Sequence, residues 1–460
     1  MEIHYLHALR LGFSTRDAAV ISAEGVGAYI RNQLHTPYDL DEPDFIRESP
    51  KNFSELRKLR RKADAGGVEL ENAAMPLRKI HGQWKSFILK RCYETNLPLR
   101  EKINLFFQNH FVATLQKTKI PFWIFKYYET INTHALGNYK TLVREMVYSN
   151  ALIFYLDNQQ NQRGKINENL ARELLELFTL GEGHYTENDI KNTALALAGL
   201  SIGEERGKYR LLLKDDSVKT VFGISGNFII DDVIDIIFQQ KNTPYLLAEK
   251  ALKWFFYDHP DKDKVKKYGD LLRENQYELK PFFQRLFEEE CNNQQGGQQI
   301  KNPLTWTFQV FHDLNLEPNY TLISFFLKTQ AMDVFDQPNV KGWKGGQHWL
   351  TSQIYEDRSR LINFLVNGNE RYQTALSRRL EKFDIGSLEF KPRFKVKDKK
   401  NAGTILQEMA NRLVFEADEQ MQDELDQLLR YDFDPHAENA DKRILQVYAY
   451  LVKSPEFQII

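Results

Sequence analysis

The stretch NENLARELLELFTLGEGHYTENDI, residues 167–190, decides the fold class, because its polar and apolar residues recur with the period of an α-helix. Asn167 suits the N-cap of this helix, and Gly181 suits the residue just past its end. At about 100° per residue, a group of polar side chains shares an arc of about 100°: Glu168, Asn169, Arg172, Glu176 and Thr179. We therefore predict a two-faced helix over residues 167–181, called the signature helix below.

Helical periodicity also dominates the rest of the chain. Long helical patterns cover residues 53–65, 69–94, 98–112, 121–135 and 138–156. Two short β-prone runs flank Asp215-Asp216 and indicate a hairpin near residues 209–221. The expected fold is all-α: an irregular multi-helical bundle with at most this small β-hairpin.

The domain organisation is expected to be simple. QQGGQQ, residues 294–299, is polar and glycine-containing, as linkers are. It separates an N-terminal helical region, residues 1–293, from a C-terminal helical region, residues 300–460. We expect the two regions to pack as one continuous unit.

Composition excludes several classes of protein. Lys+Arg 62 against Asp+Glu 63 gives a net charge of -1, so no global field attracts nucleic acid. Only Cys92 and Cys291 are present, which rules out a disulfide framework and zinc sites built from CxxC pairs.

The sequence also bears on location. No uncharged apolar run approaches the ~20 residues that span a bilayer. The first residues, MEIHYLHALRLGFSTRDAA, lack the basic and apolar regions of a signal peptide. We expect a cytoplasmic protein, or a periplasmic or exported one if an upstream segment was removed.

The polar side of the signature helix has two open interpretations. Glu168, Arg172 and Glu176 form i,i+4 pairs that suit an exposed surface. Alternatively, the loop GEGHYT folds His184 and Tyr185 back over the polar side, which then becomes the wall of a shared pocket. The sequence leaves both interpretations open.

The signature helix also carries a family resemblance. NENLARELLELFTLG followed by GHYT is similar to the most distinctive block of a large bacterial family, domain of unknown function 1800. Further blocks match in the same order: HALRLGF (residues 7–13), REKINLFFQNHF (100–111), FLKTQAMDVFDQPNVKGWKGGQHWL (326–350) and YAYLVKSPEFQ (448–458). The resemblance covers essentially the whole chain.

This resemblance implies a helical bacterial protein whose biochemical role is not established. Family members are often encoded beside a partner family that resembles secreted sulfatases and alkaline phosphatases, domain of unknown function 1501. Many members carry an export signal, which this N-terminus lacks. Members also often show His-Asp-Phe-Gly before Lys-Thr, where this chain has KDDSVKTVFG (residues 214–223). Any ligand or base supplied by that stretch elsewhere is missing here.

Candidate site residues come from these blocks. The candidates for catalysis are Glu168, Asn169, Arg172, Glu173, Glu176, His184 and His110. The candidates for contacting a ligand are Lys341, Trp343, Asn109 and Arg10. Carboxylates whose environments separate their pKa values suit general acid–base chemistry.

Imidazole and carboxylate groups also suit a transition metal, and the candidate ligands are His7, His110, Glu176 and His184. The chain has no HExxH motif and no helical ExxH pair, so hydrogen-bonded structural histidines are the competing interpretation. No cofactor is strongly implied, although a divalent metal would fit.

Two functional hypotheses follow. The first is an accessory protein that binds a sulfatase-like or phosphatase-like hydrolase. The second is an enzyme with a His/Glu/Arg pocket, with or without a metal.

Overall fold

The computed structural model describes the chain apart from several short segments. The described residues are 1–65, 75–293, 296–297, 299–368, 374, 376, 378, 390–398, 401–415, 419–429 and 433–460. The expected start of one helix, residues 69–74, and part of the predicted linker lie outside them.

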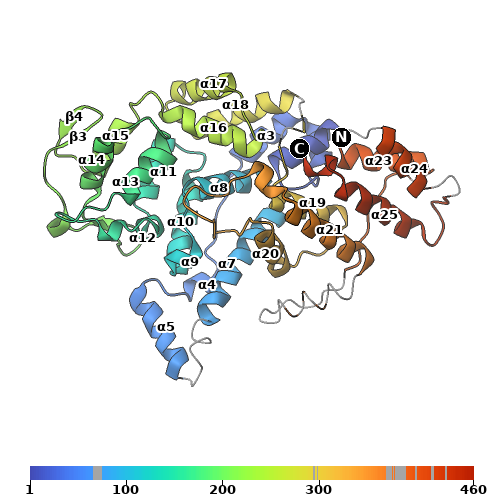
Figure 1. The fold of residues 1–460 in the computed structure, drawn as a ribbon, viewed down its shortest axis with the longest axis horizontal. Helices are drawn as coiled ribbons and strands as arrows, with labels where there is room; N and C mark the ends of the chain where they lie inside the picture. Colours follow the sequence, from blue (N-terminus) through green and yellow to red (C-terminus); the bar gives the residue numbers. More distant parts are fainter. Residues whose placement is uncertain are drawn as a thin grey trace.

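Helices dominate the architecture, which confirms the all-α prediction (Figure 1). The first part of the chain contains α1 (Ile3–Leu11), α2 (Ala18–Glu24), α3 (Val26–His35), α4 (Asp44–Arg47), α5 (Phe53–Ala65), α7 (Met75–Glu94), α8 (Pro98–His110), α9 (Leu115–Thr118), α10 (Pro121–His134), α11 (Tyr139–Val147), α12 (Asn150–Tyr155) and the 3-10 turn η1 (Asn158–Gln160).

The signature helix comprises α13 (Asn169–Glu173) and a π-helix, η2 (Leu174–Thr179). The helices that follow are α14 (Glu187–Leu197), α15 (Ile230–Ile237), α16 (Thr243–Phe255), α17 (Lys262–Glu274), α18 (Leu279–Asn292), α19 (Pro303–Asp313), α20 (Tyr320–Thr329), α21 (Ser352–Asn367), α23 (Ala402–Leu413), α24 (Glu419–Leu428) and α25 (Ala440–Lys453). Three 3-10 turns complete the list: η3 (Leu211–Leu213), η4 (Gly346–Trp349) and η5 (Glu456–Gln458). No helix among the described residues has both the length and the apolar character to cross a membrane.

Most of the predicted helices are observed, with one interruption. Residues 53–65 form α5, as predicted. The pattern over residues 138–156 forms two helices, because Ser149 adopts an extended conformation between them. A tertiary contact accompanies this break: the carbonyl oxygen of Tyr148 accepts a 2.7 Å hydrogen bond from the amide of Gly207.

In the described part of the chain, the strands form two small antiparallel pairs. β1 (Leu200–Ser201) pairs with β2 (Lys208–Tyr209), and β3 (Lys219–Val221) pairs with β4 (Ile224–Gly226). β2 and β3 lie in the predicted 209–221 region, but each pairs with a different neighbour. The tight turn at Phe222-Gly223, where both residues have positive φ, closes the second pair instead.

The hydrophobic core draws on both ends of the chain. One large cluster of buried residues includes helices from α1 through α25. The terminal ammonium of Met1 donates to the Phe415 carbonyl at 2.8 Å, and the amide of Lys301 donates to the Gln458 carbonyl at 2.8 Å. The two termini accordingly lie near each other (Figure 1). The proposed boundary at residues 294–299 stays a prediction.

Candidate functional site

The signature helix departs from regular α-geometry in its second half. It begins at Asn169 with Glu168, rather than the predicted Asn167, as its N-cap, and the Asn167 side chain accepts a 3.0 Å hydrogen bond from the Asn169 amide. At the other end, Gly181 has the expected positive φ of 89°. Between them, however, residues 174–179 form a π-helix, and the Thr179 hydroxyl donates to the Leu174 carbonyl at 2.6 Å. The wider turn rotates Thr179 into the core, where it is fully buried. The polar arc expected from 100° steps therefore ends before Thr179.

Side chains from neighbouring helices cap the end of this π-helix. The last carbonyl groups of a helix lack partners within the helix and carry partial negative charge. Here the Lys250 ammonium of α16 donates to the Leu177 carbonyl at 2.7 Å, and the Tyr139 hydroxyl of α11 donates to the Phe178 carbonyl. These contacts attach α11 and α16 to the end of the signature helix.

His110, the last residue of α8, is a neutral imidazole in this network. Its Nε2 atom lies 3.0 Å from the Tyr139 hydroxyl and 3.3 Å from the Phe178 carbonyl. Because the hydroxyl already donates to that carbonyl, both neighbours act as acceptors, which assigns the proton to Nε2. The Lys250 ammonium faces Nδ1 at 3.3 Å. Burial, followed by the charge of Lys250, lowers the pKa of His110 well below 6.5.

Lys250 is a cation whose pKa is lowered near the end of the signature helix. Burial is the main cause that lowers its pKa from 10.5 to about 8, and its two hydrogen-bond acceptors are the uncharged His110 ring and the Leu177 carbonyl. A lysine with such a pKa exchanges protons near neutral pH, as lysines in active sites do. The hydrogen bond from Lys250 to the Leu177 carbonyl is an alternative, purely structural reason for a lysine at this position.

Glu173 and Glu176 lie on the half-buried part of the signature helix. Glu176 accepts a 2.9 Å hydrogen bond from the Tyr185 hydroxyl and lies 3.4 Å from the Lys341 ammonium. Burial, followed by the charge of Glu176, raises the pKa of Glu173. Burial, followed by the hydrogen bond to Glu176, also raises the pKa of Tyr185 to about 12. The Glu176 carboxylate is thus contacted by one residue from each of two loops, Tyr185 and Lys341.

The first turn of the signature helix faces solvent. Arg172 donates to both carboxylate oxygens of Glu187 at 3.0 Å and to Glu168 at 3.3 Å. Its side chain is 36% exposed, and Asn169 is exposed as well. Arg172, Glu168 and Glu187 therefore form a surface ion-pair network that includes the expected pair of Glu168 with Arg172. Glu176 instead pairs with Lys341, and both Glu173 and Glu176 are half-buried.

The glycine-rich loop of residues 339–346 is fastened to α8. The Trp343 amide donates to the Asn109 side chain at 2.8 Å, and the buried indole of Trp343 stacks on Trp254 at a centroid distance of 6.4 Å. Gly342 has a φ of 80°, and a Cβ there would lie 2.3 Å from the Asn109 Oδ1 atom. Only glycine fits at that point, which explains the tight approach of the loop.

The remaining candidates lie apart from this network. His184 is exposed, and Tyr185 rather than His184 folds back over Glu176. His7 is buried in α1 with its Nε2 atom 3.0 Å from the Cys291 carbonyl of α18. Arg10 is also buried, and its guanidinium lies over the Phe256 ring at 5.6 Å.

The four candidate metal ligands do not form a cluster. Across the part of the chain that the structure describes, no three His, Cys, Asp or Glu side chains are grouped in a way that could hold a metal ion. Both ring nitrogens of His110 already have hydrogen-bond partners.

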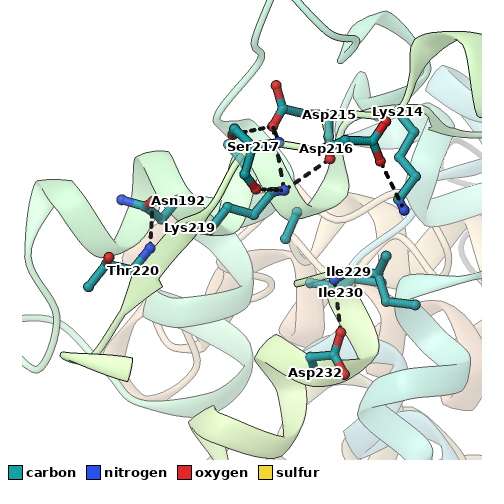
Figure 2. A network of polar contacts seen from close by, with 12 residues as sticks. Asn192, Lys214, Asp215, Asp216, Ser217, Lys219, Thr220, Ile229, Ile230 and Asp232 are labelled. Carbon is teal, nitrogen blue, oxygen red and sulfur yellow. Dashed lines mark hydrogen bonds and ion pairs between the residues drawn. The ribbon is translucent and has the colours of Figure 1, made fainter. Parts of the chain in front are cut away.

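The stretch that departs from the family pattern, residues 214–223, folds around Lys219. The buried Lys219 ammonium donates to the carbonyls of Asp215 at 2.9 Å and Ser217 at 2.8 Å (Figure 2). The Asp215 carboxylate, 3.4 Å away, supplies the opposite charge. The polar groups of Asp215, Ser217 and Lys219 therefore stabilise the conformation of this loop by contacts within it.

Two cavities lie elsewhere in the molecule. One of about 600 Å³ is lined by residues of α21, α24 and α25, including Glu424 and Tyr450. Another of about 400 Å³ is lined by Tyr93, His312, Arg412 and their neighbours. Neither cavity is lined by the signature helix.

Sequence reasoning missed Lys250 and Tyr139. A signal for Lys250 was available, because it lies three residues after Leu247 and seven after Thr243 on the buried side of α16. A lysine on such a stripe needs an acceptor inside the protein. Tyr139 carries no comparable signal, since tyrosine is common in cores.

The comparisons with known proteins agree with the block-by-block resemblance. Searches of curated proteins and of solved structures return no match. A family model described as "Protein of unknown function (DUF1800)" matches residues 4–459, nearly the full length. The chain therefore belongs to this family of proteins of unknown function.

Proposed function

We propose that this protein is an accessory protein, a rigid helical body that binds a protein partner. The observation that carries the proposal is the capping of the π-helix by Lys250, Tyr139 and His110. His110 and the signature helix come from family blocks, and Lys250 and Tyr139 from α16 and α11 hold them together. These contacts join elements that are far apart in the sequence.

A second set of contacts between family blocks supports this interpretation. The glycine-rich loop is held to α8 through Asn109 and to the signature helix through the ion pair between Lys341 and Glu176. The blocks thus behave as connectors that fix the relative positions of α8, the signature helix and the loop. Such rigidity favours a preorganised binding surface, because little conformational entropy is lost on association.

The partner class follows from the family resemblance alone. We propose a hydrolase of the sulfatase-like or phosphatase-like type, domain of unknown function 1501, as the partner. Co-expression of both full chains, followed by size-exclusion chromatography with light scattering, tests this. A stoichiometric complex is expected, whereas two separate monomeric peaks at micromolar concentration would contradict the proposal.

A second candidate function is an enzyme that uses the inward-facing groups of the signature helix. The observation that favours it is the pair of shifted pKa values, raised at Glu173 and lowered to about 8 at Lys250. A substrate screen comparing the unmodified protein with Glu173→Gln tests this alternative. Turnover that disappears in the variant supports an enzyme, and turnover unchanged by it argues against this site. Elemental analysis of the purified protein tests for a metal.

A further inference from the structure

The 3-10 turn η3 presents two leucines to solvent. Leu211 is 82% exposed and Leu212 is 94% exposed. Single exposed leucines are common on protein surfaces, but two adjacent and nearly fully exposed ones form an apolar projection that gains free energy when covered. Covering both side chains would remove their apolar surface from water, which is favourable in proportion to the apolar area buried.

The turn is held firmly, so the exposure of the leucines does not reflect a lack of local contacts. The carbonyl of Leu213 accepts a 2.8 Å hydrogen bond from the Arg163 amide, and the Arg210 amide donates to the Gly199 carbonyl at 2.8 Å. A Cβ at Gly199 would lie 2.7 Å from the Lys214 amide nitrogen, so the backbone segments are in close contact.

The next loop adds a further anchor. It is folded around the buried Lys219 ammonium (Figure 2). Hydrogen bonds on both sides of the turn therefore hold the leucine pair in place.

Basic residues adjoin the leucine turn in the chain or through a backbone hydrogen bond. Arg163, hydrogen-bonded to Leu213 through its backbone, and Lys165, two residues further on, are both exposed. Neither side chain has a hydrogen bond or ion pair with any described part of the protein. Arg210, immediately before the leucines, is exposed, and its guanidinium donates a 3.3 Å hydrogen bond to the Ile202 carbonyl. Two acids of the following loop are paired within that loop, Asp215 with Lys219 and Asp216 with Lys214.

We propose that Leu211, Leu212, Arg163, Lys165 and Arg210 form the docking surface for the protein partner. The inference rests on the proposed accessory function and names the part of the molecule that carries it. Charge complementarity specifies the chemistry of the partner: an apolar recess for the two leucines, bordered by aspartate or glutamate side chains. A rigid apolar centre with a charged rim is the usual anatomy of a specific interface.

The test measures binding of the full chain to the hydrolase-like protein by biolayer interferometry. The double variant Leu211→Ser/Leu212→Ser should bind more weakly, with a dissociation constant at least tenfold higher than that of the unmodified protein. Arg163→Glu/Lys165→Glu should slow association and reduce its dependence on salt. The matched control is Val20→Ser in α2, an exposed apolar residue outside the surface at 43% exposure. Its affinity should equal that of the unmodified protein. All variants should keep the thermal midpoint of the unmodified protein, because the substituted side chains are exposed.

The outcomes separate this inference from the proposed function. Binding that survives Leu211→Ser/Leu212→Ser overturns the docking surface but leaves the accessory function intact. An absence of binding by the unmodified protein overturns both. A parallel experiment measures co-sedimentation of the protein with vesicles of phosphatidylcholine and phosphatidylglycerol. If the unmodified protein sediments with the vesicles and Leu211→Ser/Leu212→Ser does not, the surface binds a lipid bilayer and the proposal of a protein partner is wrong.

Discussion

The amide of Trp343 donates a 2.8 Å hydrogen bond to the side chain of Asn109, joining residues 234 positions apart in the sequence. This bond requires the backbone of Gly342 to pass directly over Asn109. Two family blocks that are distant in sequence thereby become one structural unit.

Gly342→Ala should separate these blocks. The new Cβ would lie 2.3 Å from Asn109 Oδ1, and the φ of 80° is unfavourable for alanine. We expect a loss of about 2–4 kcal/mol in the free energy of unfolding, combining overpacking with backbone strain. Urea denaturation measures it.

Gly164→Ala is the matched control for that substitution. Gly164 has a similar φ of 77°, but a Cβ there meets nothing within 4 Å. Only the strain of a positive φ at alanine remains, so we expect the free energy of unfolding to fall by about 1 kcal/mol. Equal losses at the two positions would show that the approach of Gly342 to Asn109 is unimportant.

His110 should stay neutral through mildly acidic pH. Burial and then Lys250 lower its pKa well below 6.5, so the unfolded chain binds the proton more readily. The stability contributed at His110 is therefore present above pH 6.5 and is lost as the pH falls toward the folded pKa. Nitrogen-15 NMR should show an Nε2-protonated ring at pH 5.5.

A variant can verify the sign of this dependence. The stability of the unmodified protein relative to His110→Gln should decrease as the pH is lowered below 6.5, because glutamine does not titrate. A difference independent of pH would contradict the neutral assignment.

Lys250 should titrate near neutrality. Its pKa of about 8 is below the 10.5 of the unfolded chain, chiefly because of burial. Between these values the unfolded state binds more protons, so this residue makes the fold more stable as pH rises from about 8 to 10.5. The unmodified protein should gain stability over Lys250→Met across this range, as measured by urea denaturation at pH 7.5, 9 and 10.5. A constant difference would rule out the lowered pKa.

Lys102 should be essential for folding stability. Its buried ammonium donates to the carbonyls of Leu9, Arg10 and Gly12 at 2.8–2.9 Å, capping α1. Lys102→Met leaves these acceptors unpaired inside the protein, and we expect a loss of about 3–5 kcal/mol. Arg172→Ala removes an exposed ion-pair network instead, and should cost less than about 1 kcal/mol. Calorimetry of both variants measures the contrast.

Several elements could be predicted from the sequence because their causes are local. The N-terminus of α14 has a capping box with both reciprocal hydrogen bonds between Thr186 and Asp189, and the Thr-x-x-Asp pattern is typical of such a cap. The extent of α5, residues 53–65, and the positive φ of Gly181 also follow from neighbouring residues. In each case the deciding interactions lie within a few positions of one another.

The site was less predictable, because a regular helical projection places side chains correctly only while the helix is regular. The π-helix over residues 174–179 shifts the register, so Thr179 is buried and Glu176 is only partly covered. The choice between His184 and Tyr185 as the residue that folds back depends on the loop conformation, which periodicity does not encode.

The sequence alone determined the helical class, the family and the set of polar residues in the distinctive blocks, because those depend on local periodicity and on the residue types themselves. Only the tertiary structure decided the partners of those residues: Lys250 for His110, Tyr185 for Glu176 and the Trp343 amide for Asn109. The physical reason is that a buried polar group must find a hydrogen-bond partner, but any packed element can supply it.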